Sequence, residues 1–224
     1  MNIKTALKTL NGISSHQRGL FTTAQAYRAG VERYVLSRLE KEELIDRLAK
    51  GVYRIGGAPS LREEEVLVAW LSLNPAREPG AHIDPANEPV ATGATAAWLQ
   101  HLGEVGPAPL EFCTADRKQT QRKGLKLRKR RLNDKDVVRI GGILATSPAK
   151  TVLDLIDSGE DISLVASVLH DVLDKKLIVN ENTFFEEINS RSIKVGLPKS
   201  SSLYDWMMGA RQKKCSTAQN NLIE

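Results

Sequence analysis

The side chains in this chain that could do chemistry are mostly arginines and lysines, and they gather in two blocks. Residues 1–57 carry a net charge of +5 and residues 117–139 a net charge of +9, separated by an acidic stretch of −7 at residues 58–116. Positive charge concentrated in this way is typical of proteins that contact a polyanion. The alternative interpretation is that these side chains only solvate surface helices and strands.

The other reactive residue types are scattered. Cys113 and Cys215 are the only cysteines. Two cysteines do not make a zinc site, and a disulfide is not expected in a reducing compartment. Glu63, Glu64 and Glu65 are consecutive, but adjacent residues of a helix point in different directions and cannot converge on one metal ion. No carboxylate–lysine set, phosphate loop or nucleophile motif is present, which argues against an enzyme such as a nuclease. The sequence predicts no catalytic residues, no metal and no cofactor.

Length and composition favour a two-domain globular protein. The chain has 224 residues with 41% hydrophobic residues, and it contains no apolar run near the ~18–20 residues of a membrane span. Its first residues lack the apolar block of a signal peptide, so we expect a cytoplasmic protein without membrane contact. The predicted domains are residues 1–57 and 58–198, followed by a tail at 199–224 that is partly disordered or packs on a partner.

The first basic block has the pattern of three helices and a hairpin. Apolar residues at helical spacing predict a first helix from Ile3, with Gly12 after its end. A short stretch, residues 18–21, connects it to a second helix over residues 23–29, with Ala24 and Tyr27 facing inward. Gly30 suits a tight turn, because glycine accepts a positive φ at little cost.

A third helix is predicted over residues 32–42, with Val35, Leu36 and Leu39 as its buried stripe. Strands follow at residues 44–48 and 52–55, joined by a turn at residues 50–51. Three helices followed by a basic hairpin is the order of a winged helix-turn-helix, in which the third helix can enter the major groove of DNA.

Each part of this motif has a predicted contact. The second helix would offer amides near its N-cap to a phosphate, the third helix would contact bases and phosphates, and the hairpin, or wing, would contact adjacent backbone. The predicted DNA-binding residues are Thr22, Thr23, Arg33, Tyr34, Ser37, Arg38, Lys41, Arg47, Lys50 and Arg54. Two alternatives stay open: a helical bundle whose basic face is merely solvated, and a winged helix that binds protein.

The rest of the chain predicts a small sheet with several helices. A helix over residues 61–73, capped by Ser60, is followed by a proline-rich loop at 74–91, a helix from about Thr92, and strands near 110–115, 125–128 and 137–144. Two further helices follow, the first capped by Ser147 and ended by Gly159. The strand near 125 lies in the second basic block, which predicts a second basic surface of Arg122, Lys123, Lys126, Arg128, Lys129, Arg130 and Arg131.

Several of these motifs resemble the AbiEi family of abortive-infection antitoxins. The matching elements are residues 19–23, Ala29-Gly30, Arg38-Leu39 and the hairpin sequence RLAKGVYR at 47–54. The sequence TSPAKTVLDL at 146–155 and the helix ATGATAAWLQHLG are similar to later parts of the family pattern. One departure is visible: Glu42-Glu43 stands where the family often has a glycine, which predicts a longer third helix or a different start of the wing.

The resemblance implies an α+β protein, with an N-terminal winged helix-turn-helix followed by a mixed α/β domain. It also implies a function: a DNA-binding antitoxin that represses its own operon at promoter inverted repeats and counteracts a nucleotidyltransferase-like toxin. Some family members neutralise without stable toxin binding, so direct contact stays open. A free monomer that binds the repeats cooperatively is compatible with this reading. The alternative is a stand-alone winged-helix regulator whose second domain senses a ligand or a protein.

Overall fold

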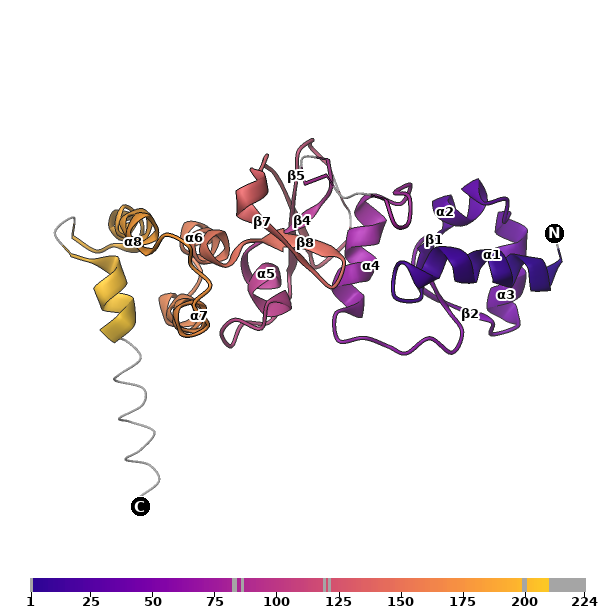
Figure 1. The fold of residues 1–224 in the computed structure, drawn as a ribbon, viewed down its shortest axis with the longest axis horizontal. Helices are drawn as coiled ribbons and strands as arrows, with labels where there is room; N and C mark the ends of the chain where they lie inside the picture. Colours follow the sequence, from indigo (N-terminus) through magenta and orange to yellow (C-terminus); the bar gives the residue numbers. More distant parts are fainter. Residues whose placement is uncertain are drawn as a thin grey trace, which may run out of the picture. The chain divides into compact units, whose positions relative to one another are not determined.

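The computed structural model describes residues 2–81, 84–85, 87–118, 120, 122–198 and 201–209 of the chain. These residues form two compact units. Unit 1 comprises residues 1–89 with 141–143, and unit 2 comprises residues 90–140 with 144–224. Figure 1 shows their elements in chain order. Cys215 and the end of the predicted tail lie outside the described residues.

Unit 1 begins with a winged helix-turn-helix. Its elements are α1 (Ile3–Ser15), β1 (Leu20–Thr22), α2 (Thr23–Arg28), α3 (Arg33–Lys41), β2 (Ile45–Ala49) and β3 (Val52–Ile55). The three strands form an antiparallel sheet in the order β1-β3-β2. The predicted fold class is confirmed, and α3 ends within one residue of its predicted bounds.

Three local predictions about this segment were wrong. Helix α1 continues through Gly12 to Ser15, because buried Leu10 and Ser14 anchor both sides of an exposed glycine. Residues 20–22, taken as part of a connection, form β1 against β3, and all three are buried. Tyr27 points outward, because the capping box of α2 turns Gln25 and Ala26 toward the interior instead.

The core of the winged helix is formed by apolar side chains from α1, α2, α3 and the wing. Its largest members are fully buried, among them Leu10, Phe21, Leu36 and Leu39. The rings of Phe21 and Tyr53 stack with their centroids 5.6 Å apart, joining β1 to β3. This core fixes the rotation of α3 and thereby decides which of its side chains face solvent.

Unit 1 also contains α4 (Glu64–Leu73), which packs on β1 and β3. The helix begins three residues later than predicted, because Ser60 does not cap it: its Oγ contacts the carboxylate of Glu64 at 3.4 Å, and no side chain caps the N-terminus. All six residues from Val66 to Leu71 are buried. The boundary predicted after Gly57 lies inside this compact unit, between the wing and α4.

The loop after α4 is tied to α2 by buried polar contacts. The Thr22 hydroxyl donates to the carbonyl of Pro75 (2.5 Å), and the Gln25 amide donates to the carbonyl of Arg77 (2.8 Å). The Arg77 guanidinium lies 5.1 Å from the centre of the Trp70 ring and 3.2 Å from the Glu88 carboxylate. Helix α2 is therefore held from behind as well as by the apolar core.

Unit 2 contains a five-stranded mixed sheet in the order β6-β5-β4-β8-β7. The strands are β4 (Val90–Ala91), β5 (Leu110–Thr114), β6 (Leu125–Lys129), β7 (Val137–Ile140) and β8 (Ile143–Thr146), of which Ile143 is grouped with unit 1. β5 pairs with β6 in parallel and with β4 antiparallel. The described strand β6 therefore lies at the sheet edge, with arginine and lysine side chains that discourage edge-to-edge pairing.

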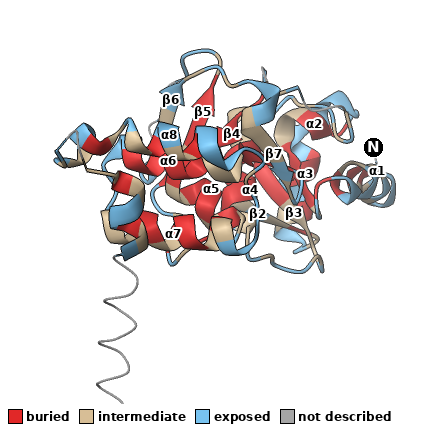
Figure 2. Ribbon diagram, turned by 60° about the vertical axis from the view of Figure 1, so that its left-hand side comes forward, coloured by how far each residue is buried: buried red, intermediate tan, exposed pale blue. Residues whose placement is uncertain are grey.

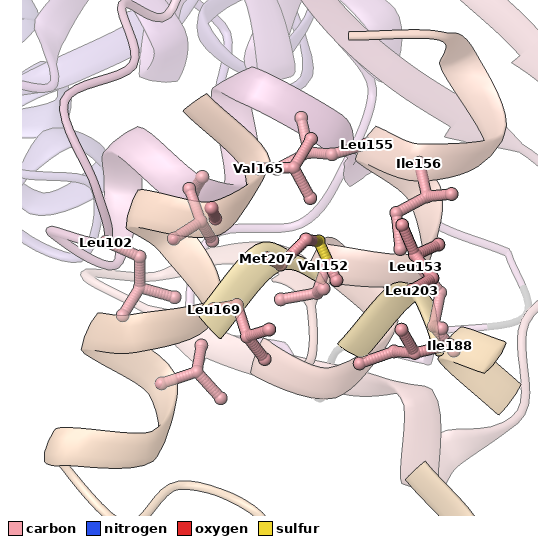
Figure 3. Packing of buried hydrophobic residues seen from close by; sticks show 14 of the residues in the cluster. Leu102, Val152, Leu153, Leu155, Ile156, Val165, Leu169, Ile188, Leu203 and Met207 are labelled. Carbon is pink, nitrogen blue, oxygen red and sulfur yellow. The ribbon is translucent and has the colours of Figure 1, made fainter. Parts of the chain in front are cut away.

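The helices of unit 2 share one apolar core. They are α5 (Gly93–Leu99), α6 (Pro148–Ser158), α7 (Ile162–Asp174) and α8 (Glu181–Asn189), with two short 3₁₀ turns, η1 (Asp134–Asp136) and η2 (Ser192–Val195). Figure 3 shows side chains from α6, α7 and α8 meeting Leu102, Leu203 and Met207. Buried residues run along β4, β5, α5 and α6 in Figure 2. Leu203 and Met207, from the predicted tail, are fully buried in this core.

Helix α6 begins and ends as the sequence predicts. The Ser147 side chain accepts a hydrogen bond from the amide of Lys150, Pro148 is the first helical residue, and Gly159 ends the helix at φ +74°. The hydroxyls of Thr146 and Thr151 lie 2.8 Å apart and are buried. The threonines of the TSPAKT sequence therefore fix the junction of β8 and α6.

Candidate DNA-binding site

Helix α3 presents the predicted polar residues to solvent. Val35, Leu36 and Leu39 are its buried stripe. The side chains expected on the other face, Arg33, Tyr34, Ser37, Arg38 and Lys41, are all exposed. A helix with one apolar stripe and a basic opposite face can bury the first in the protein and offer the second to DNA.

A hollow of about 790 Å³ opens between the helix-turn-helix and the wing, within unit 1. Five of the predicted DNA-binding residues line it: Thr23, Arg33, Ser37, Arg47 and Lys50. The other lining residues are Ala24, Tyr27, Leu36, Gly51, Val52, Tyr53, Ser72 and Pro75. The predicted site residues therefore converge from α2, α3 and the wing on one concave surface that has cations together with apolar groups.

The N-terminus of α2 does not offer a free phosphate site. The Thr22 amide donates to the Gln25 side chain (2.9 Å), the Thr23 amide to the carbonyl of Gly51 (2.9 Å), and the Gln25 amide to the Thr22 hydroxyl (3.1 Å). Thr22 itself is 0% exposed. The phosphate contact predicted there is corrected: Thr22 is a capping residue, because protein acceptors already occupy these donors.

The wing contains a β-bulge that decides which charges meet. Ala49 pairs with Val52, but beyond the bulge Arg47 pairs with Tyr53 and Asp46 with Arg54. Regular pairing from Ala49 would set Arg47 opposite Arg54, two like charges. The bulge replaces this repulsion with an Asp46–Arg54 pair and leaves Arg47 at the hollow.

Arg54 is held inside the protein. Its guanidinium contacts Asp46 at 2.9 Å and Glu64 of α4 at 2.8 Å, and only 18% of its side chain is exposed. Hydrogen bonds from Asp46 and then Glu64 raise the pKa of Arg54 further above its already high usual value. Its predicted DNA contact is therefore corrected to a link between the wing and α4.

Residues of α3 beyond the hollow differ among themselves. Arg38 forms an exposed pair with Glu42 at 2.9 Å, one turn further along the helix. Lys41 and Tyr34 are exposed and do not line the hollow. Sequence reasoning missed Tyr27, whose side chain lines the hollow and is 69% exposed. The signal that could have found it was the Thr22–Gln25 capping box, which sets the phase of α2.

The glutamates after α3 do not lengthen it. The helix ends at Lys41, and the Leu44 amide donates to the Leu39 carbonyl at 2.9 Å, as in a standard helix ending. Glu43 has φ +56°, the left-handed conformation that glycine adopts most easily. Glu43 thus keeps the backbone geometry expected of the family's glycine, and the wing begins at Ile45 as a consequence.

The second basic block is divided by the pleat of β6. Alternate residues point to opposite faces of a strand, so Lys126, Arg128 and Arg130 share one face and Lys129 lies on the other. Arg122 and Lys123 precede the strand, Arg131 follows it, and all three are exposed. The seven predicted residues are therefore not presented on a single surface.

Two of these cations have carboxylate partners. Arg130 makes a bidentate pair with Asp154 of α6, at 2.7 and 2.6 Å, and Lys126 lies 3.2 Å from Glu111. The hydrogen bonds to Asp154 raise the pKa of Arg130 above its usual value. Burial raises the pKa of the neighbouring Cys113 thiol, which keeps it protonated and unreactive. Arg130 therefore joins β6 to α6.

Comparison with known proteins identifies the first unit. Residues 13–56 match the model of a family described as "Transcriptional regulator, AbiEi antitoxin". This segment is an AbiEi antitoxin domain. The match runs from the end of α1 through the wing, so the resemblance inferred from the sequence is confirmed over these residues. AbiEi proteins of this family are transcriptional regulators, not enzymes, and the match supports a DNA-binding regulator.

The fold is similar to that of a solved structure, the RV2827C protein from Mycobacterium tuberculosis. The TM-score is 0.50 and the identity 14%, with 92% of this chain and 77% of that chain covered. At this identity the likeness concerns the fold alone. A search of curated proteins finds no match. Among the described residues, none of the helices has both the length and the apolar character needed to cross a membrane.

Proposed function

We propose that this AbiEi protein binds double-stranded DNA through α3 and the wing and represses the promoter of its own operon. The observation that carries the proposal is the convergence of Arg33, Ser37, Arg47 and Lys50 on one hollow. None of the three cations has an ion pair among the described residues, so each can neutralise a phosphate without first leaving a carboxylate.

The dimensions suit the major groove of B-DNA. A helix of nine residues such as α3 is about 13 Å long, and the groove is about 12 Å wide. With α3 in the groove, Arg33 and Ser37 would approach base edges, while Arg47 and Lys50 on the wing would meet the flanking backbone. Phosphate contacts would supply most of the affinity and α3 the sequence preference.

A mobility shift on the gene's own upstream region tests this proposal. An Arg33→Ala/Arg47→Ala variant should bind much more weakly, and the slope of log affinity against log salt should fall by about 1.8 if both side chains contact phosphates. A Lys4→Ala/Lys8→Ala variant removes the same charge from the exposed side of α1 and should bind normally. Equal binding by the two variants would move the interface elsewhere.

The antitoxin part of the proposal rests on the family. We propose that the chain counteracts a nucleotidyltransferase-like toxin encoded beside it, whether or not the two proteins form a stable complex. Co-expression of the neighbouring gene with and without this chain tests it, with cell growth as the readout. Growth arrest that this chain does not relieve, or no neighbouring nucleotidyltransferase gene, would favour a stand-alone regulator.

We propose that the exposed part of the second basic block adds affinity for the DNA backbone. Its candidate contacts are Arg122, Lys123, Lys129 and Arg131, which are exposed and have no ion pair among the described residues. Replacing all four by alanine should weaken binding of every sequence alike and reduce the salt dependence. An unchanged salt dependence would show that unit 2 does not contact DNA through these residues.

A further inference from the structure

Tyr27 has no structural reason to be where it is. Its side chain is 69% exposed at the end of α2, although a tyrosine ring is a large apolar group that proteins usually bury at least in part. Folding does not need it outside, because Gln25 and Ala26 already fill the inward positions of this short helix. A large exposed aromatic side chain of this kind is typical of contact sites.

The surroundings of Tyr27 are apolar on one side and cationic on the other. It lines the hollow together with Ala24, Leu36, Val52 and Pro75, and with the cations described above. A phosphate would gain from the cations but nothing from the apolar wall. A ligand that satisfies both halves has negative charge and an exposed apolar group close together.

Duplex DNA offers one such apolar group on its base edges. The 5-methyl group of thymine projects into the major groove, where the other edge groups are hydrogen-bond donors and acceptors. We infer that Tyr27 is a specificity-determining residue whose ring packs against a thymine methyl, while Arg33 and the wing hold the neighbouring phosphates. This inference rests on the proposed binding of DNA by the same surface.

The matched control is the other exposed tyrosine of the motif. Tyr34 on α3 is 63% exposed but does not line the hollow. The two side chains have the same chemistry and similar exposure, so they differ in the feature that carries the inference. Tyr27→Phe keeps the ring and removes the hydroxyl, which separates methyl contact from hydrogen bonding to phosphate. All these substitutions are at exposed positions and should leave the fold intact.

The test compares thymine with uracil in one duplex. Wild-type protein first selects a duplex from a random-sequence pool, and that duplex is then synthesised with thymine or with deoxyuridine, which lacks only the methyl. We expect wild type, Tyr27→Phe and Tyr34→Ala to bind the uracil duplex about fourfold more weakly for each contacted thymine. Tyr27→Ala should bind the two duplexes equally.

The outcomes separate the inference from the function on which it rests. If no duplex is enriched, DNA binding and the role of Tyr27 fall together. If wild type binds its selected duplex but ignores the methyl, or if Tyr27→Ala keeps the full thymine preference, only the role of Tyr27 is overturned. A Tyr27→Ala loss that is equal for both duplexes would show a backbone contact and would also overturn it.

Discussion

Replacing Arg54 separates two roles that the sequence alone could not distinguish, a contact with DNA and a support for the wing. Arg54 donates to Asp46 through Nε (3.2 Å) and Nη2 (2.9 Å) and to Glu64 through Nη1 (2.8 Å). If these contacts occupy the guanidinium, Arg54→Ala should reduce stability and leave the number of phosphate contacts unchanged.

The magnitude follows from how exposed the partners are. The side chains of Arg54 and Glu64 are 18% and 17% exposed, whereas Asp46 is 46% exposed. Exposed ion pairs contribute about 0–1 kcal/mol, and removing one partner of a buried pair costs about 3–5 kcal/mol. The Arg54–Glu64 contact lies between these limits, so we expect Arg54→Ala to lower the free energy of unfolding by about 2 kcal/mol.

Urea unfolding of Arg54→Ala, Glu64→Gln and the double variant measures this contribution as a coupling energy, expected at about 1 kcal/mol. The salt dependence of DNA binding then supplies the discriminating measurement. Arg54→Ala should keep the wild-type slope, while Arg47→Ala should reduce it by about 0.9, the value for one lost phosphate contact. A slope for Arg54→Ala that falls as far as that of Arg47→Ala would refute the supporting role and restore the predicted DNA contact.

Three further predictions concern stability. Glu43→Gly should raise the free energy of unfolding by about 0.5–1 kcal/mol by relieving a left-handed residue, while Glu42→Gly, at φ −86°, should lower it; thermal melts distinguish the two. Thr22→Val should cost about 1–2 kcal/mol in urea unfolding because it removes the cap of α2 and the bond to Pro75, and Thr22→Ser should keep most of that stability. Burial alone would raise the pKa of Asp157, but hydrogen bonds from Arg191 and Lys194 outweigh it and lower the pKa below 3.8. That stability is present above pH 3.8 and lost as pH falls through the folded-state pKa, so the deficit of Asp157→Asn should shrink below about pH 4.

The elements that the sequence predicts well are those with a long apolar stripe or a standard cap. Val35, Leu36 and Leu39 fix α3, and Ser147 and Gly159 fix the ends of α6, because each signal lies within its own helix. Strand β1 was missed for the opposite reason. It has three residues, all buried, so it shows no alternation, and it exists only because β3 returns to pair with it.

Site residues were harder to predict, because their roles depend on partners elsewhere in the chain. Arg130 meets Asp154, 24 positions away, and that contact follows from the way α6 packs beside β6. Arg54 meets Asp46 only because of a bulge, which no local composition signals. Tyr27 was misplaced because two apolar residues in a six-residue helix do not define a face. The Thr22–Gln25 capping box carried more information than the apolar spacing.

Positive charge in the sequence is thus a poor guide to the interface until each cation is matched with the carboxylates around it. An arginine already bound to a carboxylate must break that pair before it can neutralise a phosphate, so its net gain from DNA is small. By this criterion Arg54 and Arg130 support the fold, and Arg33, Arg47 and Lys50 remain as cations that share one hollow. The acidic residues of unit 1, Asp46 and Glu64 in particular, therefore shape the interface as much as the basic ones, because they decide which cations are left for DNA.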